Sequence, residues 1–181
     1  AAQDLLVDGT IDAPAGSIAL TAGSGSNAFQ SKIWLGSNAR LLATGVVRID
    51  PVSETGLKTG DVLDAGQVTL VQQQGSIVAE PGAAINVDAV AATLNVGAQG
   101  VASKVSGDAG EVAFTVANSL LYSGTLSANS AGQQGGELSL VLDPRTRDKA
   151  EGAIPISGTA ISPRGPHTIV FADFNGPLPG Q

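Results

Sequence analysis

The sequence contains no cysteine and no methionine, and aromatic residues make up only 3% of it. Without cysteine, a disulfide framework, a thiolate metal site and a cysteine nucleophile are all excluded. Because aromatic residues are scarce, the interior must be filled mainly by valine, leucine, isoleucine and alanine. Side chains of this moderate and uniform size suit a narrow, regular core.

Charge is also sparse, at 14% of residues, and the nine lysines and arginines are scattered along a chain of net charge −7. No basic stripe is present to neutralise phosphates, so nucleic acid is excluded as a partner. No stretch approaches 18 uninterrupted apolar residues, and the first eight residues lack the features of a signal peptide. We therefore expect a soluble piece whose export signal lies outside it.

What the sequence does contain is 43% hydrophobic residues, 24 glycines and nine prolines in 181 residues. This length suits one domain with a continuous core. Frequent glycine and proline with little charge is typical of many short strands joined by tight turns. No segment of ten or more residues has an apolar helical period, and the closest is the short Ala89–Leu94. The composition therefore predicts an all-β chain with very little helix.

Two degenerate repeats recur along this chain, and each is a short run of alternating apolar and polar residues. The first, a glycine followed by an alternating strand, occurs at residues 16–20, 66–70, 75–79, 110–114 and 136–140. The second lies between these, at residues 9–13, 84–87 and 124–128. Gly110, Gly124 and Gly136 predict that two such strands and their turns return the chain to an equivalent place after 26 residues. Recurrence of this length indicates a right-handed parallel β-helix.

In such a fold each strand pairs with its counterpart in the next coil at about 4.8 Å, and inward side chains stack in columns. The predicted inward set is Ile18, Leu20, Val68, Leu70, Ile77, Ile85, Val87, Val112, Phe114, Val116, Leu126, Leu138 and Leu140. The predicted outward set is Ser17, Ala19, Gln67, Thr69, Glu111, Thr115 and Ser139. Glycines are expected at the corners because they accept a positive φ without steric cost.

Two segments interrupt this rhythm. Residues 38–60 contain a predicted strand, Leu41–Ile49, and a polar loop, Pro51–Gly56, that leaves the coil. The second interruption begins with a charged run at residues 143–151, and prolines follow it around one expected strand, Thr168–Phe174. We therefore expect β-helical coils over residues 1–142, and over 143–181 a charged loop and an irregular, proline-rich C-terminal segment that serves as a cap or linker.

Short motifs for catalysis or cofactor binding are incomplete. Lys58-Thr59-Gly60 matches one element of serine β-lactamases, but no serine lies three residues before any lysine. The glycine-rich stretches at 23–25 and 132–136 complete no phosphate-binding loop. At the only histidine, His167, a metal site would need carboxylates alone as its other ligands and a triad has no partners that can be placed, so a histidine in a surface turn is expected. The sequence thus predicts no catalytic residue, no cofactor and no metal.

One enzymatic alternative remains, a carbohydrate-active parallel β-helix of the pectinase or lyase kind. Such enzymes use acids clustered on one external face, which Asp61, Asp64, Glu80 and Asp88 would supply. Two absences argue against this enzymatic alternative. Polysaccharide subsites usually also contain aromatic and basic residues, but this region has no aromatic residue and only Lys58 as a nearby basic residue.

Two further sets of residues have both a structural and a functional interpretation. The mixed charges of residues 143–151 favour a solvated loop, with a recognition excursion as the alternative. Trp34, Phe29 and Tyr122 lie outside the most regular repeats. Core or coil-end positions are expected for these aromatics, and exposed contact residues are the alternative.

The repeats at residues 9–13, 16–22 and especially 75–87 resemble those of filamentous haemagglutinin-like exoproteins, the passengers of two-partner secretion. The resemblance covers residues 1–142 and lies in repeat style. It implies a secreted β-helical shaft at the bacterial surface that mediates adhesion, biofilm formation or toxin delivery. The implied partners are an outer-membrane transporter during secretion, neighbouring coils of the same chain, and a host or bacterial surface receptor or glycan. The family's shaft has no catalytic residues to carry over.

Overall fold

The computed structural model describes residues 4–24, 31–51, 56–97, 99–132 and 134–142, which lie in the first of two compact units of the chain, Ala1–Arg145. All regular structure in these residues is strand, in sixteen segments, which confirms the all-β prediction. No helix in the described part of the chain is long and apolar enough to span a membrane. The charged run and the proline-rich segment predicted over 143–181 lie outside the described residues.

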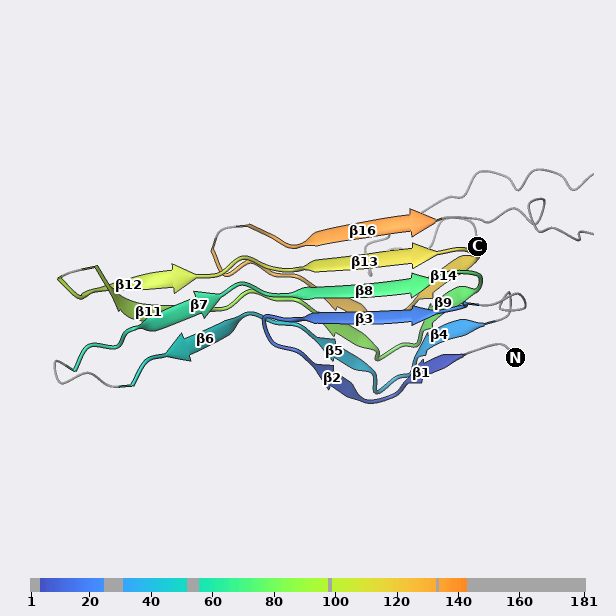
Figure 1. Cartoon of the computed structure of the whole chain (residues 1–181), viewed down its shortest axis with the longest axis horizontal. Coiled ribbons are helices and arrows are strands. Elements are labelled where there is room, and N and C mark those ends of the chain that lie inside the picture. Colours follow the sequence, from blue (N-terminus) through green and yellow to red (C-terminus); the bar gives the residue numbers. More distant parts are fainter. Residues whose placement is uncertain (1–3, 25–30, 52–55, 98, 133, 143–181) are drawn as a thin grey trace, which may run out of the picture. The chain divides into compact units, whose positions relative to one another are not determined.

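Twelve of the strands form three parallel sheets of four strands each (Figure 1). Sheet A consists of β1 (Leu5–Val7), β4 (Lys32–Leu35), β9 (Ser76–Ala79) and β14 (Ser119–Tyr122). Sheet B consists of β2 (Thr10–Asp12), β5 (Arg40–Leu42), β10 (Ala84–Asn86) and β15 (Thr125–Ser127). Sheet C consists of β3 (Ser17–Ala22), β8 (Gln67–Gln72), β13 (Glu111–Val116) and β16 (Glu137–Leu142).

The chain visits sheets A, B and C in this order four times, and we call each visit to the three sheets a pass. Strands that pair within a sheet therefore come from successive passes. Glu111 pairs with Glu137, which agrees with the predicted return after 26 residues. The prediction of two strands per return was wrong, because each pass has three. Sheet A was missed as a separate repeat because residues 75–79, which contain β9, were grouped with the first repeat, and because β14 follows Ala117 and Asn118 without a leading glycine.

Two β-hairpins leave the passes at equivalent places, between sheets B and C (Figure 1). The second pass contains β6 (Val46–Ile49) and β7 (Gly60–Leu63), and the third contains β11 (Ala91–Val96) and β12 (Val101–Ser106). The hairpins are joined at Asn95, whose backbone N–H donates to the Lys58 carbonyl at 2.7 Å and whose Oδ1 accepts from the Lys58 N–H at 2.7 Å.

Two segments near these hairpins differ from, or decide, what the sequence predicted. The single strand predicted over Leu41–Ile49 is in fact β5 and β6, which belong to different sheets. Between them the backbone N–H groups of Ala43 and Gly45 still donate to carbonyls of the following pass, so the chain leaves its sheet only after Gly45. The alanine-rich Ala89–Leu94, the closest approach to a helical pattern, leads into strand β11.

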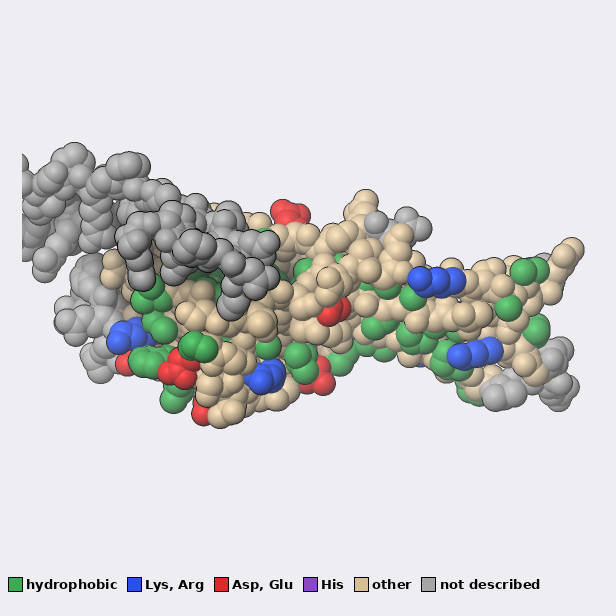
Figure 2. Space-filling view, turned by 180° about the vertical axis from the view of Figure 1, so that it is seen from behind, with side chains coloured by type: hydrophobic (Ala, Val, Ile, Leu, Met, Phe, Trp, Pro, Cys, Tyr) green, Lys and Arg blue, Asp and Glu red, His purple; other side chains and the backbone are tan. Residues whose placement is uncertain are grey.

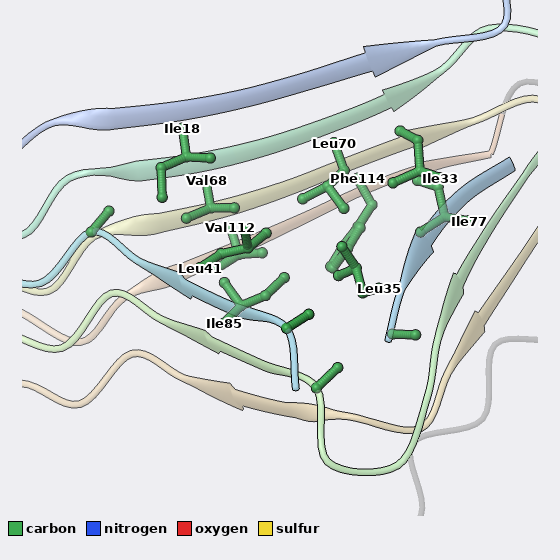
Figure 3. Packing of buried hydrophobic residues seen from close by; sticks show 14 of the residues in the cluster. Ile18, Ile33, Leu35, Leu41, Val68, Leu70, Ile77, Ile85, Val112 and Phe114 are labelled. Carbon is green, nitrogen blue, oxygen red and sulfur yellow. The ribbon is translucent and has the colours of Figure 1, made fainter. Parts of the chain in front are cut away.

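The core consists of side chains stacked in columns across the sheets (Figure 3). In sheet C, Ile18, Val68 and Val112 share one column, and Leu70 pairs with Phe114 in another. Most of the predicted inward set is buried, and none of the predicted outward set is. Leu20 and Leu140 are partly buried, and Leu126 and Leu138 are 40% and 46% exposed because β15 and β16 are the last strands of their sheets.

Tyr122 takes the core position expected for it. Its ring meets that of Phe114 edge to face, with centroids 5.6 Å apart, and its hydroxyl donates to the Thr125 carbonyl at 2.9 Å. Burial raises the pKa of the Tyr122 phenol well above its ordinary value.

The corner glycines before the strands of sheet C are required for a different reason from the one predicted. Positive φ is found at other glycines, including Gly23 and Gly82, but not at Gly16, Gly66, Gly110 or Gly136. These four precede the strands of sheet C, where the backbone of one pass lies directly against that of the next. A Cβ on Gly66 would overlap the Gly16 carbonyl, and one on Gly110 would overlap the Gly66 carbonyl.

One core column contains a polar side chain. Gln72 lies between Ala22 and Val116, is fully buried, and has no hydrogen-bond partner for either its Nε2 or its Oε1. We expect Gln72→Leu to raise the free energy of unfolding by about 1–3 kcal/mol, because an unpaired amide would no longer be desolvated. Chemical denaturation would measure this effect. Gln73→Leu, at the next and only partly buried position, serves as the control. A loss of stability in Gln72→Leu would show that the amide has a stabilising role.

Candidate contact site on the outer face of sheet A

The outer face of sheet A carries an apolar column where polar side chains are the usual expectation. Because strand side chains alternate, Leu5 and Val7 pack against the core whereas Leu6 between them points outward. The parallel register places Leu6, Trp34, Val78 and Leu121 side by side on successive strands. Leu6 is 67%, Trp34 37% and Leu121 60% exposed. We call these four residues the sheet A column.

The indole of Trp34 is held in a fixed orientation. Its Nε1 donates a hydrogen bond to Oε1 of Glu80 at 2.9 Å. The other carboxylate oxygen, Oε2, accepts from the backbone N–H of Ser37 at 3.1 Å. Glu80 directly follows β9, which pairs with β4. A residue of the third pass therefore positions the Trp34 ring of the second pass. A rigid, partly exposed aromatic ring is a typical centre for a binding surface.

A cation already lies over this ring. The Nζ of Lys32 is 5.5 Å from the centroid of the Trp34 ring, which is within the range of a cation–π interaction. Lys32 and Trp34 point to the same side of β4 because they are two residues apart. The backbone N–H of Lys32 donates to Oδ1 of Asp4 at 2.9 Å, which ties β4 to the residue before β1.

Beside the ring is a shallow groove of about 360 Å³. It is lined by Leu6, Asp8, Trp34, Gly36, Ser37 and Glu80. Oδ1 of Asp8 accepts from the backbone N–H of Asn38 at 3.1 Å. Gly36 leaves room for this carboxylate, because a Cβ there would overlap it. Figure 2 shows hydrophobic, acidic and basic side chains gathered at the end of the molecule where β1 and β4 lie.

The groove carries more negative than positive charge. Asp8 and Glu80 line it, and Asp4 accepts from the backbone N–H of Lys32, whose ammonium lies over the ring. This local excess has the same sign as the net charge of the chain, −7. The arrangement combines an aromatic face, exposed aliphatic surface and carboxylates, and is therefore suited to non-covalent contact.

The four acids of the enzymatic alternative lie in four separate bonding environments. Asp61 forms a 2.7 Å ion pair with Arg48 in the first hairpin, and Asp64 accepts from the backbone N–H of Asp108 at 2.7 Å. Asp88 accepts from Ser127 and from the backbone N–H of Asn129, each at 2.6 Å. Glu80, as described, holds Trp34. Within the described residues, no group of three or more histidine, cysteine or acidic side chains is placed to hold a metal ion.

Six acids, three of them from the enzymatic alternative, share a structural role that the sequence did not reveal. Asp4, Asp8, Asp64, Asp88, Asp108 and Glu80 each accept a hydrogen bond from a backbone N–H of a neighbouring pass. At the corners between strands such N–H groups lack a ladder partner, and a charged acceptor makes a stronger bond than a neutral one. Carboxylates therefore link one pass to the next, which accounts for part of the acidic excess.

Of the other residues singled out in the sequence, Lys58-Thr59-Gly60 leads into β7 and joins the hairpins through Lys58. Trp34 is exposed, as the alternative interpretation for the aromatics requires, and its role in contact stays a prediction. Phe29 and His167 lie outside the described residues. Sequence reasoning missed Leu6, Asp8 and Ser37 as neighbours of Trp34. Aligning residues 5–7 with 33–35 as one repeat would have placed Leu6 beside Trp34.

Fold and site together define an all-β protein of parallel sheets with an exposed apolar column around a tryptophan on one of them. Comparisons of the chain with protein-family models, with curated proteins and with solved structures give no significant match.

Proposed function

We propose that this chain is a segment of a right-handed parallel β-helix from a large secreted bacterial surface protein, in which it provides structure and an adhesive surface without catalysis. The observation that carries this proposal is that the chain passes through the same three parallel sheets four times in the same order. Each pass then corresponds to one coil. Such an assembly extends by adding coils, and each coil contacts only its neighbours.

The handedness and the shaft role have physical support. Parallel strands of one sheet joined by a crossover connection are right-handed in nearly all proteins, because of the twist of the strands. The carboxylate bonds between passes and the absence of cysteine suit a long extracellular shaft that needs no disulfides. Secretion through an outer-membrane transporter, as in the haemagglutinin-like exoproteins, is part of the proposal.

The adhesive role is supported by the sheet A column. A rigid apolar surface with a central tryptophan is unusual on the water-facing side of a sheet and is a common mark of recognition. We propose that it contacts a receptor or a glycan on a host or bacterial surface.

Binding of the fluorescently labelled chain to bacterial and epithelial cells would test the adhesive role. We expect saturable binding that falls at least about fivefold in the triple variant Leu6→Ser/Trp34→Ser/Leu121→Ser, because about 1 kcal/mol of apolar contact would be lost. The matched control is Leu63→Ser/Val96→Ser/Val101→Ser, which removes three exposed aliphatic side chains from the hairpins. Absence of saturable binding, or equal loss in both variants, would contradict an adhesive role for sheet A.

A further inference from the structure

We propose that the groove beside Trp34 binds a lysine or arginine side chain from a basic segment of a partner protein. This inference rests on the proposed contact role and names the chemistry of its ligand. Three features of the groove carry it: the ring, the two carboxylates and the exposed aliphatic surface.

The ring face is suited to a cation, because the negative π-face of tryptophan attracts ammonium and guanidinium groups more strongly than those of other aromatic residues. Lys32 demonstrates this at the site itself, with its Nζ 5.5 Å from the ring centroid. The bond from Nε1 to Glu80 keeps the ring from rotating when a ligand arrives. Little conformational entropy is therefore lost at the ring on binding.

The carboxylates have acceptor capacity left. A carboxylate has about four lone-pair sites. Glu80 uses its two oxygens for Trp34 and Ser37, and Asp8 accepts from Asn38 through Oδ1. Both line the groove, so a cation over the ring would have carboxylates within the same groove. Such charge-assisted bonds are stronger than bonds to a neutral ligand.

The aliphatic surface suits the stem of a long basic side chain, which packs on apolar groups while its charged end stays polar. Leu6 at 67% exposure provides this surface at the groove, and Val78 and Leu121 extend it along the column. A basic partner is also attracted at longer range by a chain of net charge −7. A neutral sugar would stack on the Trp34 ring but gain nothing from the negative charge of the groove, and an anionic partner would be repelled by that charge.

Trp34 is the only tryptophan of the chain, so its fluorescence reports on the groove directly. We expect a saturable change when the whole chain is titrated at low salt with a Gly-Ser peptide that carries two lysines and one leucine. The same peptide with acetylated lysines should give no change, and added salt should weaken binding by screening. A neutral oligosaccharide serves as the competing ligand.

Three variants, measured by calorimetry, test the geometry. Asp8→Asn and Glu80→Gln should each weaken peptide binding about tenfold, since each removes a charge worth about 1.4 kcal/mol. Asp8→Asn keeps the oxygen that accepts from Asn38, whereas Glu80→Gln keeps only one of the two acceptors used by Trp34 and Ser37. Asp12→Asn, which removes the same charge from the exposed side of β2 in sheet B, should leave binding unchanged. Lys32→Gln should tighten binding about threefold, because the internal cation no longer competes for the ring.

Binding of the oligosaccharide in place of the lysine peptide would overturn this proposal, and so would equal weakening by Asp12→Asn or weaker binding in Lys32→Gln. Absence of any fluorescence change would also overturn it. If the peptide fails to bind while cell adhesion still depends on the sheet A column, the ligand class is wrong but the adhesive function stands. If adhesion fails as well, both proposals fall.

Discussion

Leu70→Asp is expected to unfold the protein or to lower its free energy of unfolding by about 4 kcal/mol or more. Leu70 is fully buried at the centre of sheet C, paired with Leu20 on one side and Phe114 on the other. An aspartate there would lose its hydration, and its apolar neighbours on both sides would offer no hydrogen bond in return. Loss of the β-sheet signal in circular dichroism, or a large shift of the urea midpoint, would report the effect.

Thr69→Asp is the matched control for this prediction. Thr69 is the adjacent residue on β8, points to the opposite side of the sheet and remains partly exposed. We expect a change of about 1 kcal/mol or less. Equal effects at the two positions would mean that the two faces of sheet C do not differ in burial, and a larger effect at Thr69 would mean that the faces have been exchanged. Leu140 lies in the same column as Phe114. It is only partly buried, because β16 is the last strand of the sheet, so an aspartate there would have a smaller effect than one at Leu70.

Gly66→Ala should cost about 3 kcal/mol, although it adds a single methyl group. The new Cβ would overlap the backbone carbonyl of Gly16, which accepts a hydrogen bond from the Gln67 N–H at 3.0 Å. The overlap is with backbone, so no side-chain rotation relieves it, and the corner between sheets B and C must open. Thermal denaturation followed by circular dichroism would measure the loss.

Gly9→Ala provides the comparison, because nothing lies within 4 Å of a Cβ at that position. It should leave the melting temperature nearly unchanged or raise it slightly, since alanine restricts the unfolded chain. If Gly66→Ala were equally harmless, close backbone approach would not be the reason for glycine at this corner.

The site illustrates how surface chemistry and fold stability are connected in this protein. Glu80 both orients Trp34 and caps a backbone N–H of the preceding pass, and Asp8 likewise binds the Asn38 N–H while it lines the groove. Asp8→Asn keeps the one oxygen that accepts from Asn38 and so separates binding from folding, whereas Glu80→Gln keeps only one of two acceptors and also tests the fold. Gln72 is the contrasting case, a polar side chain with no bonding role among its neighbours.

The sequence by itself determined the all-β class of the fold and the two faces of the strands of sheet C. Alternation at Ile18, Val68 and Val112 was enough, because a period of two places such residues on one side of a strand whatever that strand pairs with. Scarce aromatics and frequent glycine likewise predicted short strands and tight corners. These are local properties of the chain.

Only the tertiary structure decided which strands become neighbours, and the site depends on this. Leu6, Trp34 and Glu80 are remote in sequence, and they meet because β1, β4 and β9 are paired in register. The three-strand pass, the split of Leu41–Ile49 into two sheets and the hairpins also depend on pairing between passes. The physical reason is that hydrogen bonds of a parallel sheet join distant segments, whose register is set by the packing of all columns at once and not by any one strand.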